Sequence, residues 1–151
     1  MHLKHQLQKV QAHFNALEEY YKYIQESGFD FKVKSYSQLS VADRGVLDAY
    51  LKRFASLQDY LGAKVFKSLL DSAGISYTKM SEVLTTIEKE EIVDLDTWIA
   101  FRNIRNNLEH DYPDELQEAL EDLKYCLDSF HDMEKIVQKV FAFARRYDAG
   151  I

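Results

Sequence analysis

The stretch "LKHQLQKVQAHFNALEEYYKYI", from Leu3 to Ile24, repeats apolar side chains at alternating spacings of four and three residues. The members of this seam are Leu3, Leu7, Val10, Phe14, Leu17, Tyr21 and Ile24. Such spacing gives a helix one apolar stripe, and a stripe that lasts for about three heptads is normally buried against other helices. The stretch therefore predicts a long amphipathic helix that ends near Ser27-Gly28.

Residues that interrupt helices are scarce in the whole chain, which has one proline and five glycines among 151 residues. Sheets and tight turns use both residue types, so their scarcity favours helices. Four further helices are expected, from Ser40 to Gly74, from Lys79 to Glu91, from Asp94 to Tyr112 and from Pro113 to Ala144. Residues 29–38 alternate apolar and polar side chains like a strand, but no second strand is expected to pair with them. We therefore predict a packed connection there.

Helices with apolar seams and short connections are typical of bundles. We predict an all-α fold, an antiparallel bundle of four to five helices, in a single domain that spans residues 1–151. Ser40 and Asp43 form a capping-box pattern at the start of the second helix. Apolar residues make up 46% of the chain and charged residues 29%, a composition that suits a folded protein rather than a disordered one.

Charge, cysteine content and hydropathy limit the classes of function. The formal net charge of −6 weighs against a protein that coats nucleic acid, although it leaves room for a locally basic groove. Cys126 is the one cysteine and lies among apolar positions, so we expect a buried, inert thiol rather than a disulfide or a nucleophile. The N-terminal stretch carries charges where a signal peptide has an apolar run, and no segment approaches the length of a membrane span. A cytoplasmic protein without membrane contact is expected.

Polar side chains gather in "RNIRNNLEHDYP", residues 102–113, at the end of the predicted fourth helix. On an ideal helix, one apolar sector of this segment holds Trp98, Phe101, Ile104 and Leu108. Arg102, Asn106 and His110 follow a separate polar stripe at a spacing of four, and Arg105 lies on the border between the two faces.

Arg105 and His110 are about 140° apart around such a helix. They address one point only if the arginine reaches across, the helix distorts before Pro113, or a second copy of the helix faces the first. The alternative is a helix end that is merely polar. Asparagine is common near helix ends, and a histidine in the last turn complements the helix dipole.

The segment "RNNLEHDY", from Arg105 to Tyr112, resembles the signature of HEPN-domain proteins, which is Arg, four residues of which the first is polar, His, any residue and Tyr. It is most similar to the branch in which a HEPN toxin is paired with a minimal nucleotidyltransferase (MNT) antitoxin, and "WIAFRN" at 98–103 also resembles that branch. The fold resemblance covers the whole chain, whereas the motif covers eight residues. It implies a metal-independent ribonuclease that needs no cofactor and works as a homodimer, with two motif copies facing across the two-fold axis.

This resemblance also implies roles for single residues, and the side-chain chemistry fits them. Histidine ordinarily titrates near neutral pH, so His110 suits general acid or base work in cleavage through the RNA 2′-hydroxyl. Arg105 can hold the phosphate and stabilise the charge that develops there. Asn106 can orient His110 or Arg105, or donate a hydrogen bond to a phosphate oxygen. Arg102 and Tyr112 are expected to bind substrate. In the toxin–antitoxin branch the motif tyrosine resembles a target for nucleotidylation, which makes Tyr112 the expected modification site.

The sequence is compatible with two functions. The first is an RNase toxin, an endoribonuclease, neutralised by an MNT antitoxin. The second is a non-catalytic subunit that presents substrate to a nucleotidyltransferase. The acidic net charge favours the second, whereas the intact Arg–Asn–His–Tyr set favours the first. No metal site is expected, because the other histidines are scattered along the chain at His2, His5, His13 and His131.

Overall fold

The computed structural model describes residues 2–110 and 116–151, with side chains for all of these except residues 108–110. Within these ranges the structure is helical and contains no strand. Its elements are α1 (His2–Ser27), α2 (Val33–Gln38), α3 (Val41–Tyr60), the π-helical turn η1 (Leu61–Val65), α4 (Phe66–Ser72), α5 (Met80–Lys89), α6 (Leu95–His110), α7 (Leu116–Asp128) and α8 (Phe130–Tyr147).

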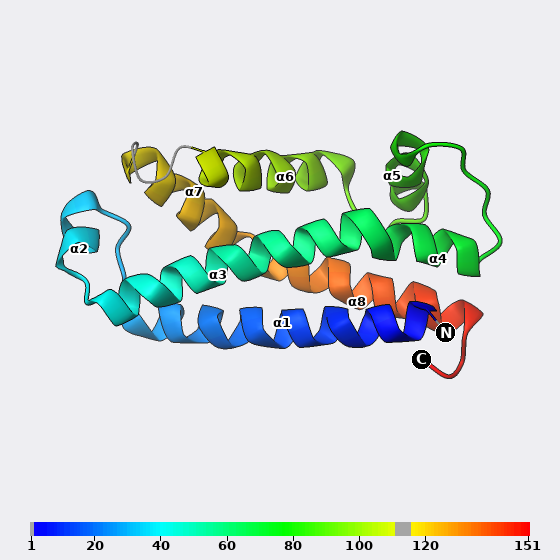
Figure 1. Ribbon diagram of the computed structural model, residues 1–151, viewed down its shortest axis with the longest axis horizontal. Helices are drawn as coiled ribbons and strands as arrows, with labels where there is room; N and C mark the ends of the chain where they lie inside the picture. Colours follow the sequence, from blue (N-terminus) through cyan, green and yellow to red (C-terminus); the bar gives the residue numbers. More distant parts are fainter. Residues whose placement is uncertain (1, 111–115) are drawn as a thin grey trace.

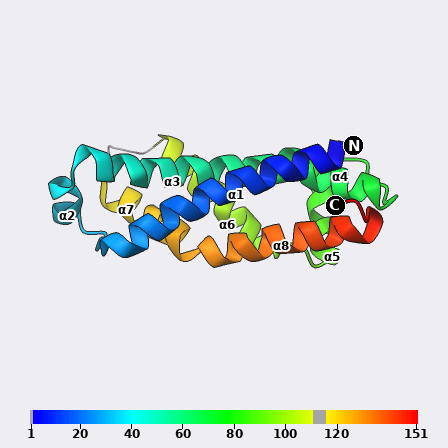
Figure 2. The same ribbon diagram turned by 90° about the horizontal axis from the view of Figure 1, so that it is seen from below.

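These elements form an elongated antiparallel bundle, which confirms the predicted all-α fold (Figure 1). Helix α1 runs in one direction, α3, η1 and α4 return as one rod, α6 runs back, and α7 with α8 returns again. The start of α1 and the end of α8 lie at the same end of the bundle, as the view from below also shows (Figure 2). Helix α5 lies beside the start of α6 at that end, and α2 lies at the opposite end.

The apolar seam of α1 packs against α3 and α8, as its spacing predicts. Leu7, Val10 and Leu17 are buried completely or nearly so. Tyr21 is half-buried, and its ring stacks on that of Phe130 in α8, with 4.0 Å between ring centroids. The residues that first indicated a bundle helix therefore form one wall of the core.

The predicted helix boundaries are largely confirmed. The hydroxyl oxygen of Ser40 accepts a hydrogen bond of 3.0 Å from the backbone N–H of Asp43, so the predicted N-cap of α3 is present. Gly28 follows the end of α1 with a φ of 68°, and Gly74 follows the end of α4 with a φ of 71°. Both glycines adopt the left-handed conformation that commonly ends a helix and that side chains with a Cβ disfavour.

Three segments differ from the prediction in detail. The connection at 29–38 does pack on the core through Phe29, Phe31 and Tyr36, but it contains the short helix α2. The predicted second helix is interrupted by η1. The predicted fifth helix is two helices, because the chain bends at the buried residue Ser129.

The bend at Ser129 is explained by the packing of its neighbour Phe130. This ring lies against Tyr21 and Phe14 of α1, with centroids 4.0 and 5.5 Å away. Backbone hydrogen bonding continues through the bend, since the N–H of Ser129 donates to Tyr125 and its carbonyl accepts from Met133. The apolar spacing of the predicted fifth helix indicates which residues are buried, but it does not indicate that the helix axis changes direction at Ser129. The predicted start of the fifth helix at Pro113-Asp114 lies outside the described residues.

Candidate functional site

Helix α6 is fixed in place by a cap at its start and by the apolar sector predicted from sequence. The carboxylate of Asp94 accepts hydrogen bonds from the backbone N–H and the hydroxyl of Thr97, at 3.0 and 2.9 Å. Trp98 and Phe101 are buried, and Ile104 packs against the core at half-burial. Burial of this face determines which side chains of α6 remain at the surface.

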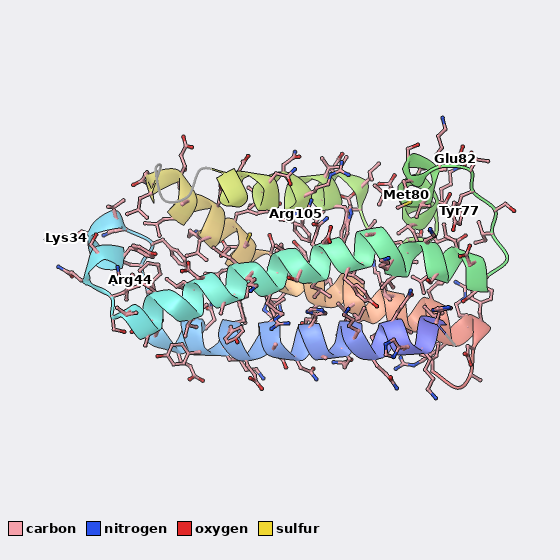
Figure 3. All side chains as sticks on the ribbon, viewed as in Figure 1. Lys34, Arg44, Tyr77, Met80, Glu82 and Arg105 are labelled. Carbon is pink, nitrogen blue, oxygen red and sulfur yellow. The ribbon has the colours of Figure 1, made fainter. Side chains whose placement is uncertain are left out.

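Arg105 leaves α6 at the edge of the buried face and extends toward α3 (Figure 3). Its Nη1 donates to Oε1 of Gln58 at 2.8 Å and to Oδ1 of Asp59 at 3.1 Å. Its Nη2 donates to Oδ1 of Asn106 at 3.3 Å. The Arg105 side chain is 19% exposed, whereas that of Asp59 is 68% exposed. The guanidinium is thus held at the border between protein and solvent, as the helix geometry predicted.

Gln58 and Asp59 are the two residues of this network that were not predicted from the sequence, and Gln58 is the buried one. Gln58 is 2% exposed and lies in the last turn of α3, four residues after Phe54 and three before Leu61 of η1. A buried amide oxygen without a partner costs about 1–3 kcal/mol, so its bond with Arg105 matters to the fold as well as to the position of the arginine. A glutamine at a seam position was the available signal, since that position otherwise favours an apolar residue.

A groove of about 360 Å³ lies beside Arg105, between α3 with η1 on one side and α5 with α6 on the others. Its floor includes the buried Gln58 and Trp98. Arg102, which is exposed, and Arg105 form one rim. Met80, on α5, forms part of the opposite wall (Figure 3). The two arginines of the predicted cluster therefore meet in one concave surface.

The π-helical turn η1 brings the backbone close to this floor. A Cβ atom added to Gly62 would lie 3.3 Å from Cζ2 of Trp98, so glycine permits an approach that a larger residue resists. Single π-helical turns within α-helices are rare and frequently occur at functional sites. In this structure Gly62 and Ala63 of η1 line the groove.

The remaining predicted site residues are placed less completely. Asn106 is exposed and bonded to Arg105. His110 is the last residue of α6, but its side chain lies outside the described part of the structure. Tyr112 lies outside the described residues altogether. The structure thus joins Arg102, Arg105 and Asn106 and leaves the relation of Arg105 to His110 as a prediction.

The residues that the structure describes also bear on three other possibilities, a reactive thiol, a metal site and a membrane span. Cys126 is 1% exposed, and burial raises the pKa of its thiol to about 12, in keeping with the predicted inert thiol. Among the side chains that the structure describes, those of residues 2–107 and 116–151, no group of three or more His, Cys, Asp or Glu is placed to hold a metal ion. No helix in those ranges is both long and apolar enough to cross a membrane.

We compared the chain with protein-family models, with characterised proteins and with solved structures, and found no match in any of the three. Function must therefore be inferred from the residues of the groove and from the motif on α6.

Proposed function

We propose that the chain is a metal-independent endoribonuclease of the HEPN/MNT toxin–antitoxin type, which acts as a homodimer. The observation that carries the proposal is the network around Arg105. A buried amide and a carboxylate of α3 position the guanidinium beside a second arginine, on the helix that leads to His110. Two arginines at one groove suit a phosphate substrate.

Arg105 retains the donors that such chemistry requires. A guanidinium has five N–H groups, and the hydrogen bonds to Gln58, Asp59 and Asn106 engage three of them. The remaining donors can bind a phosphate oxygen while the α3 residues keep the group oriented. A positioned donor stabilises developing charge better than a mobile one, because it does not have to reorganise during the reaction.

In the proposed reaction the RNA 2′-oxygen attacks the adjacent phosphorus, and the bond from phosphorus to the 5′-oxygen breaks. One proton leaves the 2′-hydroxyl and one is delivered to the 5′-oxygen. His110 is the proposed group for one of these transfers, and Asn106 orients a reacting partner. The products are a 2′,3′-cyclic phosphate and a 5′-hydroxyl. Arg105 stabilises the pentacoordinate phosphorus that forms after the 2′-oxygen attacks and before the 5′-oxygen leaves.

The proposed antitoxin partner is a minimal nucleotidyltransferase that transfers AMP from ATP to the hydroxyl of Tyr112, with release of pyrophosphate. The added group would bring bulk and negative charge to the motif. Intact-mass measurement of the chain after incubation with partner and ATP would detect this addition, and Tyr112→Phe should not acquire it.

The test of the chemistry is cleavage of RNA by the purified chain, free of any partner. His110→Ala should lower the rate by about a hundredfold to ten-thousandfold, the usual size of general acid–base help. Arg105→Lys should also lose activity, because lysine offers a point charge instead of a planar two-point grip. Lysine can still donate to the buried oxygen of Gln58, so this variant tests chemistry with less harm to the fold than alanine. Arg146→Lys, at an exposed position of α8, is the matched control.

Activity should persist in a chelator, and the products should carry cyclic phosphate ends. If the wild-type chain leaves RNA intact and His110→Ala behaves identically, the nuclease proposal is wrong. The non-catalytic subunit that presents substrate to a nucleotidyltransferase would then take its place.

A further inference from the structure

The groove beside Arg105 extends well beyond the motif on α6. Its far wall comes from α5, which contributes Met80, Ser81 and Leu84. Met80 is 47% exposed, so part of its apolar side chain is open to solvent at this wall. None of these α5 residues belongs to the Arg–His motif, and the proposed cleavage chemistry does not require them.

The two sides of the groove differ in chemistry. The α6 side presents the guanidinium groups of Arg102 and Arg105, in a chain whose net charge is −6. The α5 side presents the apolar surfaces of Met80 and Leu84, with the hydroxyl of Ser81 between them in sequence. A ligand that fits both sides must have an anionic group at one end and a flat or apolar body at the other.

The size of the groove and its fixed floor also limit the ligand. A volume of about 360 Å³ lies at the lower end of the range for small-molecule sites, which is about 300–1,000 Å³. Gln58 and Trp98 are at most 2% exposed, so the floor is built from packed core residues. Asp59 adds a carboxylate at the rim, 3.1 Å from Nη1 of Arg105, where it can accept a hydrogen bond from a sugar hydroxyl or a base amine.

We propose that this groove is a nucleotide subsite, which holds the phosphate of one nucleotide on Arg102 and Arg105 and its base against Met80 and Leu84. The proposal rests on the proposed ribonuclease function, and it adds that one nucleotide of the RNA strand next to the scissile phosphate is bound by α5 and η1. Bases can be held between aromatic or apolar side chains, while cationic side chains follow the phosphates. Because Arg105 belongs to both the subsite and the motif, occupation of the groove aligns the strand with the reaction centre.

The test measures binding apart from cleavage. A fluorescent single-stranded RNA with 2′-O-methyl groups throughout has no free 2′-hydroxyl and cannot be cut by the proposed chemistry. Its affinity is measured by fluorescence anisotropy. Ala63→Phe fills the groove from an exposed position of η1, and Met80→Glu places a carboxylate on the apolar wall. Each should weaken binding by about tenfold or more.

Matched controls carry the same changes elsewhere. Ala12→Phe alters an exposed alanine of α1, and Val41→Glu alters an apolar residue that is 78% exposed at the start of α3. Both should bind the RNA as the wild type does. Competition with 5′-AMP and with inorganic phosphate then distinguishes the ligand classes. The subsite predicts that AMP competes at lower concentration than phosphate, and that Ala63→Phe removes this difference.

The outcomes separate the subsite from the nuclease. If wild-type chain cuts ordinary RNA but the groove variants bind the methylated RNA normally, the subsite is wrong and the nuclease stands. If the groove variants lose binding but wild-type chain cuts nothing, the subsite stands and the nuclease is wrong. If phosphate competes as well as AMP, the groove binds an anion only and the nucleotide assignment is overturned. If AMP competes but RNA does not bind, the groove takes free mononucleotides and its role in holding an RNA strand is overturned.

Discussion

His13 lies between two cations at the interface of α1 and α3, where its ring also faces Tyr60. Its Nδ1 is 3.0 Å from Nη1 of Arg53, and the ring centroids of His13 and Tyr60 are 6.1 Å apart. Lys9 lies one turn away on α1, with its ammonium 4.7 Å from the centre of the Tyr60 ring. Burial, and then the charges of Arg53 and Lys9, lower the pKa of His13 below the ordinary value of 6.5. The 3.0 Å contact is explained if the His13 ring is neutral and its Nδ1 accepts a hydrogen bond from Arg53.

This lowered pKa predicts a pH dependence of stability. Below about pH 6.5 the unfolded chain takes up the His13 proton more readily than the folded chain, so the free energy of unfolding falls as pH falls through that window toward the folded pKa. His13→Asn keeps an acceptor for Arg53 but cannot be protonated, so we expect a smaller loss of stability between neutral and mildly acidic pH. Urea denaturation at several pH values measures the free energy of unfolding of each variant. His5→Asn, on the exposed face of α1, is the control. Parallel curves for wild type and His13→Asn would contradict the expectation.

At the scale of single residues, sequence predicts which face of a helix a side chain occupies, but not its partner on another helix. The border position of Arg105 follows from its helical spacing and is what the structure shows. Its acceptors Gln58 and Asp59 are 47 and 46 residues away in sequence, so their contact depends on the register between α3 and α6. That register is set by the packing of many side chains, and no local pattern encodes it.

At the scale of elements, η1 and α6 meet where Gly62 lies against Trp98. Trp98 is 1% exposed and packs on Phe66, with 4.9 Å between ring centroids, so it has little room to move. Gly62→Ala would bring a methyl group to 3.3 Å from the indole. We expect this overpacking to outweigh the better helix propensity of alanine and to destabilise the fold by about 1 kcal/mol.

Gly45→Ala is the matched control, because Gly45 is an exposed residue of α3 with no atom within 4 Å of an added Cβ. There the gain in helix propensity should appear unopposed, as a stabilisation of about 0.5–1 kcal/mol. Thermal unfolding followed by circular dichroism, at equal protein concentrations, compares the two variants. If Gly62→Ala stabilises the protein as much as Gly45→Ala does, the contact with Trp98 is not tight.

Elements with a clear seam or cap were predictable, and those that depend on distant packing were not. The Ser40 cap and the glycines after α1 and α4 are local signals, and each marks a boundary in the structure. The π-helical turn η1 has no such signal, since its residues continue the apolar spacing of α3. The bend at Ser129 also has no local sequence signal, because it depends on the packing of Phe130 against α1.

At the scale of the whole molecule, α6, the helix that carries Arg105, lies on the outside of the bundle (Figure 1). Helix α6 buries Trp98 and Phe101 against the core, whereas Arg102 and Asn106 of its polar stripe are exposed. Within one chain Arg105 turns toward α3, whereas His110 is about 140° away around an ideal helix. A second copy facing the first would supply both groups to each of two grooves, which is why the proposed ribonuclease requires a homodimer.

We expect the two copies to meet near the ends of their α6 helices. Light scattering at micromolar concentration should give twice the mass of one chain, and a monomer there would refute the dimer. His110→Cys should form an intermolecular disulfide rapidly under mild oxidation, because the two-fold axis would bring both copies of that position together. The native Cys126 is 1% exposed and its pKa is raised by burial to about 12, so it should not compete in this reaction. Gln8→Cys, at an exposed position of α1, should cross-link only slowly if α6 rather than α1 forms the interface.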